Sequence, residues 1–505
     1  MSPNQLSCGL PCVRVPAERA NRPEGESSVE ALIGWLNGII WSKALIALCL
    51  GAGLYFSIRT RFLQVRGVRE MVRLMLSGEK SPAGVSPFQA LAISLSGRVG
   101  IGNIAGVATA IYFGGPGAVF WMWVVAFLGA STAYVESTLG QIYKEIDDKG
   151  QYRGGPAYYI EKAMGQRWYA WLFAVVTVVA TGFLLPGVQA NGIAASMYNA
   201  WSIPPTATAT LLVVALGFII FGGVKRIAAF AQVVVPFMAL AYILVALVIM
   251  FLNYAQIPAM FALVFKSAFG MEAAFGAVLG LAIEWGVKRG IYSNEAGQGT
   301  GPHAAAAAEV SHPAKQGYVQ AFSVYVDTLL VCSATAFMIL STGMYNVNDP
   351  EGGMLMEALP GIEVGPGFAQ NAVESILPGY GAAFVAMALL FFAFTTILAY
   401  YYMAETNVAY INRKIHRPWT VFVLRLAILA AVTFGSVRSA EMAWTLGDIG
   451  VGLMAWLNIV AILILQKPAL VALRDYEQQK RQGIDPVFDP DALGIRNADL
   501  WRRRE

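Results

Sequence analysis

The chain has 505 residues, of which 57% are hydrophobic and 13% are charged, and its mean hydropathy is +0.57. Soluble domains carry about 25% charged residues, so this composition excludes an ordinary soluble domain and predicts a chain that lies in a lipid bilayer. The net charge of +4 gives no sign of a nucleic-acid partner, and the four cysteines and three histidines have no metal-binding spacing.

The first 27 residues mix Pro, Gly, Ser and Arg without an apolar run, so they predict neither a signal peptide nor a folded domain. Residues 1–37 are expected to be a mostly disordered N-terminal tail. A membrane-spanning helix needs roughly 17–25 mainly apolar residues, and residues 38–466 contain eleven such stretches. They are about 38–57, 87–112, 117–142, 168–192, 206–222, 229–252, 268–290, 318–343, 379–404, 418–437 and 443–466. Residues 467–505, rich in Arg and Asp, are expected to be a partly disordered cytoplasmic tail.

The distribution of positive charge predicts an orientation. Lysine and arginine near membrane spans stay on the cytoplasmic side. Alternation of the eleven spans places 27 of the 35 lysines and arginines on one side and five on the other. The larger group includes Lys288 and Arg289, assigned to the connection after the seventh span. We therefore expect a multi-pass protein of a bacterial-type inner (plasma) membrane, with its N-terminus outside and its C-terminus in the cytoplasm.

Without the first span, ten remain, and they divide into two sets of five, about 87–252 and 268–466. Because five is odd, the second set enters the membrane from the opposite side, as in an inverted repeat. Each set opens with a glycine-interrupted helix, at Ser96–Gly106 in the first and Phe275–Gly280 in the second. Freed backbone cannot face lipid, but its amides can bind a carboxylate and its carbonyls a cation. Such paired interruptions indicate a transporter's binding site, although the same glycines also suit close helix packing.

Five stretches carry a resemblance to a known family: VGIGNIAGVATAIYFGGPGAVFWMW (99–123), RGGPAYYIEKAMG (153–165), VQAN (188–191), KRGIYSNEAGQGTGPHAAAAA (288–308) and HPAKQG (312–317). They resemble motifs of the alanine or glycine:cation symporter family, over about residues 38–490. The resemblance implies an all-α membrane protein of the leucine-transporter (APC) type, with an N-terminal helix, a five-plus-five inverted repeat and two discontinuous helices. It implies a secondary transporter that imports alanine, glycine or a similar small neutral amino acid with sodium by alternating access.

The resemblance also implies site residues for the substrate. Backbone amides around the first interruption, at Gly100, Ile101, Gly102 and Asn103, would receive the substrate carboxylate. Gln189 of the fourth span would bind the polar end of the substrate. Three residues of the seventh span are candidates for the wall of the pocket, although packing aromatics would look the same in the sequence: Phe275, Gly276 and Trp285.

Sodium is the implied coupling ion, not a tightly bound cofactor. By the same resemblance, the carbonyls of Ser96 and Val99 would face the ion together with the hydroxyls of Thr395 and Thr396. These donors make an all-oxygen shell of low charge, which suits a monovalent hard cation. The alternative for the two threonines is a hydrogen bond back to their own helix.

Several charged residues lie at predicted membrane depth, where an ionisable group indicates a functional site by default. Arg98 stands where the family commonly has a small or neutral residue. Its guanidinium is a candidate partner of the substrate carboxylate or of an acid such as Glu136, or a substitute for the cation. Four acids are proton-coupling groups, structural partners of Arg98 or Arg425, or groups near a span end in water: Glu136, Glu284, Asp327 and Asp448. Glu295 is expected to cap a cytoplasmic turn at Ser293–Gly297, with gating as the alternative role of this turn, and Ala304–Ala308 to form a short interfacial helix.

Two other classes of transport stay open from the sequence. Arg98 and the buried acids favour proton-coupled or exchange transport of a related amino acid, such as glutamine or serine; a channel is a further alternative. An enzyme or an ATP-driven pump is not expected, because no predicted span contains His and the G-x-x-x-x-G-K-[ST] pattern is missing from the sequence. The expected partners are the amino acid, sodium and the lipid bilayer, with the chain as a monomer and without nucleic acid.

Overall fold

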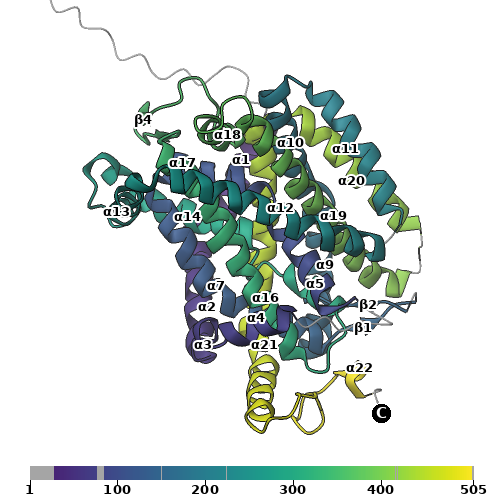
Figure 1. Ribbon diagram of the computed structural model, residues 1–505. Helices are drawn as coiled ribbons and strands as arrows, with labels where there is room; N and C mark the ends of the chain where they lie inside the picture. Colours follow the sequence, from purple (N-terminus) through teal and green to yellow (C-terminus); the bar gives the residue numbers. More distant parts are fainter. Residues whose placement is uncertain are drawn as a thin grey trace, which may run out of the picture.

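The computed structural model describes residues 28–76, 85–148, 150–222, 224–415, 417 and 419–502. The apolar runs form upright helices (Figure 1), because a helix satisfies its own backbone hydrogen bonds in lipid. The first half of the chain contains α1 (Ser28–Ile40), α2 (Lys43–Arg59), α3 (Leu63–Arg66), α4 (Val68–Leu76), α5 (Pro87–Arg98), η1 (Gly102–Gly106), α6 (Val107–Gly114), α7 (Gly117–Ile142), α8 (Pro156–Tyr159), η2 (Ile160–Met164), α9 (Arg167–Val179), η3 (Ala180–Leu184), α10 (Leu185–Trp201), α11 (Pro205–Ile220) and α12 (Val224–Leu252).

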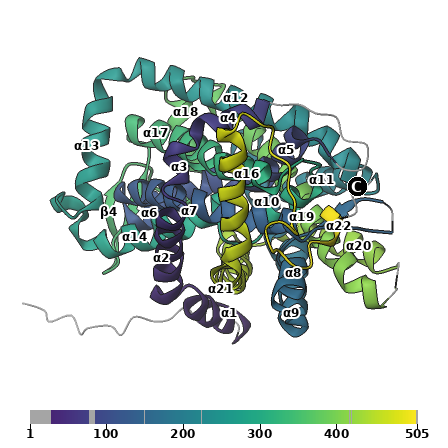
Figure 2. The ribbon, with the colours of Figure 1, turned by 90° about the horizontal axis from the view of Figure 1, so that it is seen from below.

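The second half continues with η4 (Tyr254–Gln256), α13 (Ile257–Ala268), η5 (Ala273–Val278), α14 (Leu279–Asn294), α15 (Gly301–Ala307), α16 (Pro313–Val324), η6 (Tyr325–Cys332), α17 (Ser333–Thr342), α18 (Pro366–Glu374), α19 (Gly381–Ile415), α20 (Trp419–Val437), α21 (Ala440–Arg481) and α22 (Asp499–Arg502). Two antiparallel hairpins lie at opposite ends of the bundle: β1 (Glu145–Ile146) with β2 (Tyr152–Arg153), and β3 (Asn346–Asn348) with β4 (Met354–Glu357). Seen from below, α13 lies on one flank of the bundle and α11 and α20 lie on the other (Figure 2).

Eight helical segments of the described chain are long and apolar enough to cross a membrane, and the bent pair α5 and η1–α6 makes nine. The remaining predicted spans, 206–222 and 268–290, coincide with α11 and α14, which are 16 residues long each. Each predicted span thus contains a helix. The prediction of a mostly helical, multi-pass membrane protein is confirmed.

Within the described residues, both tails are more ordered than the sequence predicted. Helix α1 begins at Ser28, inside the expected N-terminal tail. Helix α21 runs for 42 residues, past the predicted end of the last span at residue 466. The disorder predicted beyond that point is wrong, because apolar side chains anchor the segment that follows α21: Phe488, Ile495, Ala498 and Trp501 are all buried.

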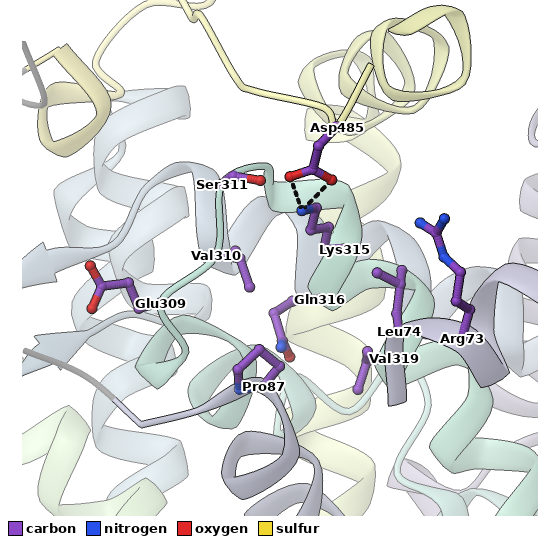
Figure 3. A pocket seen from close by; sticks show the side chains of 10 residues that line it. All are labelled: Arg73, Leu74, Pro87, Glu309, Val310, Ser311, Lys315, Gln316, Val319 and Asp485. Atoms are coloured by element: carbon purple, nitrogen blue, oxygen red, sulfur yellow. Dashed lines mark hydrogen bonds and ion pairs between the residues drawn. The ribbon is translucent and has the colours of Figure 1, made fainter. Parts of the chain in front are cut away.

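This C-terminal segment, residues 482–502, is fixed to the end of the bundle that carries β1 and β2. Lys315 Nζ lies 2.9 Å from both carboxylate oxygens of Asp485 (Figure 3). Ser311 Oγ donates to the Pro486 carbonyl (2.7 Å), and Trp501 Nε1 donates to the Gln141 carbonyl (3.0 Å). A cavity of about 280 Å³ lies beneath the Lys315–Asp485 pair.

His312 precedes α16 and joins it to α21. Burial lowers the pKa of its imidazole below the usual range, although the neighbouring Asp475 acts in the opposite direction. A neutral ring has one donor and one acceptor nitrogen. Nδ1 accepts from the Ala314 amide at 3.1 Å, so Nε2 carries the proton and donates to Asp475 Oδ2 at 3.1 Å. His312 is therefore a neutral structural link in this fold.

Helices α10 and α20 approach closely at two glycines, as small residues allow in membrane proteins. A Cβ atom on Gly435 would collide with the backbone of Gly187. A Cβ atom on Gly187 would instead lie 3.5 Å from the Ala431 carbonyl and 3.6 Å from Gly435 Cα, which is ordinary contact. The contact is thus asymmetric between two glycines that face each other.

We predict that Gly435→Ala destabilises the protein by about 1–3 kcal/mol, the usual cost of overpacking, because neither backbone can yield cheaply. Gly187→Ala should be neutral or slightly stabilising, since alanine is the better helix former by about 0.5–1 kcal/mol. Thermal unfolding of the purified variants in detergent measures both. Equal unfolding midpoints for the two variants would contradict the packing described.

Candidate functional site

The first predicted interruption is present. Helix α5 begins at a capping box formed by Ser86 and Gln89 and ends at Arg98. Val99 then leaves the helical conformation (φ −79°, ψ 89°), and the chain bends by 50° before continuing as η1 and α6. A side chain at Gly100 is excluded, because its Cβ would lie 2.5 Å from Thr396 Oγ1 and 2.9 Å from Gln189 Oε1. The backbone of this first break thus lies directly against α10 and α19.

Side-chain oxygens bind the amides that the first break frees. The Gly100 amide donates to Asn103 Oδ1 (2.8 Å), and the Ile101 amide donates to Gln189 Oε1 (2.9 Å). All these residues are buried. The structure therefore brings Gln189 to the first break, as predicted, and shows two adjacent amides that point at acceptor oxygens.

The predicted ion ligands differ in their contacts. Thr396 Oγ1 lies 3.3 Å from the Val99 carbonyl and 2.9 Å from the Phe392 carbonyl. Thr395 Oγ1 donates only to its own helix, at the carbonyls of Phe391 and Phe392 (both 2.9 Å). Ser96 Oγ likewise bonds to the Ile93 carbonyl (2.7 Å), which leaves its own carbonyl as the candidate donor. Thr396 is thus the threonine whose hydroxyl reaches the first break.

The interruption predicted at Phe275–Gly280 lies at the beginning of α14 and not inside a buried helix. Residues 273–278 form a 3-10 turn in which Phe275 leaves the helical conformation (φ −120°, ψ 15°), and Gly276 is exposed with open space around it. A buried non-helical stretch, the second break, lies instead at residues 295–300, between α14 and α15. Glu295 has φ +56° there, which is rare for a residue with a side chain. The cytoplasmic turn and the interfacial helix predicted for this region are therefore corrected to a broken, buried helix.

The two breaks face each other. A Cβ on Gly97 would lie 3.2 Å from Glu295 Oε2, and a Cβ on Gly102 would lie 3.2 Å from Ser293 Cα. Glycines in the first segment thus allow the second to approach it. Two interrupted helices from different halves of the chain meet in the interior.

Glu136 of α7 holds the second break. Its carboxylate accepts from the amides of Gly297 (3.2 Å) and Gly299 (3.1 Å), both of which have φ near +85°. Asn458 Nδ2 donates to Glu136 Oε2 (2.7 Å) and to the Gly297 carbonyl (2.9 Å). Buried backbone groups need such partners. Glu136 therefore holds the backbone of the second break, a contact that neither sequence alternative, a proton-coupling group or a partner of an arginine, described.

Asp327 connects both broken helices to η6. Its Oδ1 accepts from Asn103 Nδ2 at 2.6 Å, and Ser293 Oγ lies 3.0 Å from each carboxylate oxygen. Thr328 Oγ1 donates to Oδ2 at 2.6 Å. Within the described residues, Asp327 has no cationic group at ion-pair distance. Asp327 is fully buried, and a single residue, Asn103, lies between its carboxylate and the freed Gly100 amide.

Arg98 does not form the ion pair with Glu136 that the sequence allowed. Its Nη1 donates to the Gln320 carbonyl (3.1 Å) and to Ser323 Oγ, and among the described atoms its Nε and Nη2 have no acceptor. Arg98 is 1% exposed, and its guanidinium interacts electrostatically with the carboxyl groups of Glu295, Glu136 and Asp327. One buried arginine thus faces three buried carboxylates.

The wall residues predicted on the seventh span lie elsewhere. The Trp285 ring stacks on Phe113 with centroids 4.3 Å apart, and Phe275 Cδ1 would lie 3.7 Å from a Cβ on Gly115. Thirteen helical residues separate Ile101 from Gly114, which corresponds to roughly 20 Å. Phe275, Gly276 and Trp285 are therefore too far from the first break to line a site there.

Sequence analysis missed a buried charge cluster in α14. Lys288 and Arg289 lie inside the helix, not in a cytoplasmic connection. Arg289 binds Asp448 of α21 through two hydrogen bonds (2.9 and 2.7 Å), and Lys288 Nζ lies 2.8 Å from the same carboxylate. The Arg289 guanidinium also lies over the Trp444 ring, 4.5 Å from its centroid. The only sequence signal was an acid at membrane depth, and its partners are 159 and 160 residues away.

A cavity of about 690 Å³ leads from one end of the molecule to the first break. It reaches Ile101 and Gly192, passes Trp444, and is otherwise lined by α10, α18 and the end of α20. At the opposite end, the Val85 amide donates to the Ala307 carbonyl (3.0 Å) and the Glu309 amide to the Val85 carbonyl (3.3 Å). Lys144 Nζ also donates to the Ala308 carbonyl (2.6 Å). The two backbone hydrogen bonds join the beginning of α5 to the end of α15, and Lys144 adds a contact from the end of α7.

Comparison with known proteins places these features in one family. The family model described as the sodium:alanine symporter family matches residues 26–490. A putative sodium/proton-dependent alanine carrier protein of Bacillus subtilis, YrbD, is 63% identical over 93% of this chain and 96% of that protein. The sodium/proton-dependent alanine carrier protein of Bacillus sp. (strain PS3) is 54% identical over 85% of this chain and 97% of that protein.

Among solved structures, MhsT in complex with L-phenylalanine has a TM-score of 0.51 at 15% sequence identity, and the match covers 78% of this chain and 99% of that chain. At this identity the likeness concerns the fold alone. The helical bundle thus shares the fold of MhsT.

We predict that Glu136→Ala destabilises the protein by about 2–4 kcal/mol, because two buried amides and Asn458 lose their acceptor. Glu284→Ala is the matched control: this acid of α14 is partly exposed and makes no hydrogen bond among the described contacts. Its effect should stay within about 0.5 kcal/mol. Thermal unfolding separates the two, and an equal loss in both variants would remove the structural role of Glu136.

Proposed function

Because the chain belongs to the sodium:alanine symporter family, we propose that it imports alanine or a similarly small neutral amino acid together with sodium, by alternating access. The observation that carries the proposal is the meeting of two broken helices, at residues 99–101 and 295–300, in the buried interior. Freed backbone at this depth is costly, and it is the element that binds zwitterions and ions in carriers built from repeats.

The substrate carboxylate takes the place of the acceptor oxygens at the Gly100 and Ile101 amides. Gln189 and Asn103 hold those amides in the present structure, and each can turn toward the substrate instead. The substrate ammonium faces Asp327, which already contacts Asn103. The Ile101 side chain packs directly on Gly192. The Ile101 side chain therefore closes the space between the amides and α10, which supports a short substrate side chain.

Sodium lies beside the first break, at the carbonyls of Ser96 and Val99 and the hydroxyls of Thr395 and Thr396. The contact of Thr396 with the Val99 carbonyl supports this assignment. The charge balance supports a bound cation, since Arg98 alone faces three buried acids and an uncompensated buried charge is costly. The same excess of acids favours a second candidate, transport in which a proton accompanies or replaces sodium.

In the membrane, we propose eleven crossings, formed by an N-terminal helix and two inverted repeats of five at about 87–252 and 268–466. The α18 end lies outside, and the end with β1, β2 and the C-terminal segment lies in the cytoplasm, in keeping with the charge distribution. Removing the buried Lys288 and Arg289 from the count leaves that bias intact. The cavity at Ile101 then makes this an outward-facing state of a monomer in lipid.

Purified protein in liposomes should take up labelled L-alanine only when an inward sodium gradient is present. Choline in place of sodium should abolish uptake, because the buried acids then lack their counter-ion. Uptake that follows a pH gradient without sodium would replace sodium with the proton as coupling ion. Uptake that needs neither gradient would contradict symport.

Thr396→Ala should raise the sodium concentration for half-maximal uptake about tenfold, since a ligand to a charged group contributes about 1.5–3 kcal/mol. Thr396→Ser keeps the hydroxyl and should behave like the unchanged protein. Thr433→Ala is the matched control, because this exposed threonine bonds only to the Leu429 carbonyl of its own helix. An unchanged sodium requirement in Thr396→Ala would move the ion away from α19.

A further inference from the structure

A second large cavity, of about 660 Å³, lies at the end of the molecule that carries β1 and β2. It is bounded by the β1–β2 hairpin, the end of α19 and the beginning of α20. Both signs of charge line it: Arg153, Arg413, Arg417 and Arg425 on one hand, Glu145, Asp147, Asp148 and Glu405 on the other. It is separate from the cavity at Ile101, with which it shares no lining residue.

Five of these eight charged side chains form ion pairs with one another. Arg153 Nε lies 3.0 Å from Asp147 Oδ2, and Arg153 Nη2 lies 3.6 Å from Glu405 Oε2. Arg413 binds Glu145 at 2.8 Å and also contacts Glu161. These pairs form the frame of the cavity and need no further counter-ion.

The other charges have no such partner within the described chain. Arg417 and Arg425 have no carboxylate at ion-pair distance there, and Arg425 donates one hydrogen bond, to Tyr401 Oη at 2.9 Å. Asp148 is exposed and has no cation at ion-pair distance in the same residues. The cavity thus offers two guanidinium groups, of Arg417 and Arg425, and one carboxylate, of Asp148, that have no ionic partner among the described residues.

The cavity adjoins an apolar flank of the bundle. Helices α11 and α20 lie together on that flank (Figure 1), and their outward side chains are large and apolar: Phe218, Phe221, Phe422, Val423 and Leu426 are 46–70% exposed. Trp419, 58% exposed, lies at the beginning of α20, where tryptophan marks the membrane interface. Phe422 belongs to both the cavity and the flank, and the Arg425 guanidinium lies 4.9 Å from the Phe221 ring.

We infer that this cavity binds the head group of a phospholipid that carries a phosphodiester and a primary ammonium, as ethanolamine phospholipids do. The phosphate lies between Arg417 and Arg425, which suit it because guanidinium groups bind phosphate oxygens through paired hydrogen bonds. The ammonium faces Asp148. The acyl chains lie along Phe422, Leu426 and Phe221. A free amino acid has the same two charges, but it has no chains to cover the apolar flank.

The purified full-length protein in detergent tests this inference with short-chain phosphatidylethanolamine as the probe. We expect one lipid per chain by native mass spectrometry and a rise of the unfolding midpoint with lipid concentration. Phosphatidylcholine should bind more weakly, because its quaternary ammonium cannot donate hydrogen bonds to a carboxylate. Inorganic phosphate and L-alanine at the same concentration should leave this binding unchanged.

Two variants test the phosphate site and the ammonium site of the head group independently. R417Q combined with R425Q should weaken lipid binding about tenfold or more, since each lost bond to a charged group contributes about that factor. D148N, at an exposed position, should keep phosphate binding and remove the preference for ethanolamine over choline. R438Q, beyond the other end of α20, is the matched control and should change neither.

Three results would overturn the inference: unchanged lipid binding in the double arginine variant, displacement of the lipid by alanine, or equal binding of inorganic phosphate and lipid. Equal binding of the ethanolamine and choline lipids would overturn the role of Asp148. The unfolding midpoint of each variant without lipid shows whether it is folded, and D148N keeps the test decisive if the arginine variant is not.

Discussion

The hydrogen bonds from Gly297 and Gly299 to Glu136 are the constraint on which the interior of this protein depends. A helix that stops inside a membrane leaves amides and carbonyls that water cannot reach. Here one carboxylate of α7, supported by Asn458 of α21, takes those amides, and the positive φ of the two glycines turns them toward it. Glu136 binds one side of the second break, and the opposite side lies against Gly97 and Gly102 of the first break. The two breaks can therefore pair because Glu136 binds the freed amides, although burying an acid is by itself unfavourable.

The first break is held differently, and the difference bears on function. Its amides bond to the side-chain oxygens of Gln189 and Asn103, one acceptor for each amide. The second break bonds to Glu136, whose carboxyl group is held by three donors, the amides of Gly297 and Gly299 and the side chain of Asn458. A substrate carboxylate has to replace one acceptor at each amide of the first break, whereas three hydrogen bonds hold Glu136 in place. The first break is therefore the more exchangeable of the two, which suits a reversible binding site.

The sequence predicted the helical spans, the first break and its neighbours Gln189 and Thr396, because apolar length, glycine spacing and family motifs are local signals. It failed where the signal depends on distant partners. Residues 288–300 look like a polar loop because Lys288, Arg289 and Glu295 are charged, yet Asp448 neutralises the two cations from 159 or more residues away. Because of Gly276 and Gly280, the second break was predicted at the wrong end of α14. Open space surrounds both glycines, so no close approach of another helix requires them. The tail beyond residue 466 was expected to be partly disordered because it is rich in Arg and Asp, but the rings of Phe488 and Trp501 pack edge to face and are buried.

Alternating access requires that the closed end of the molecule open, and α15 is the helix that closes it. Backbone hydrogen bonds of Val85 join the beginning of α5 to the end of α15, and Lys144 donates to the Ala308 carbonyl. Gln141 of α7 also donates to the Ala308 carbonyl, and all of α15 is buried. Opening this end therefore requires α15 to separate from α7 as well as from α5, and the C-terminal segment, which Ser311 and Lys315 bind, must follow it or detach.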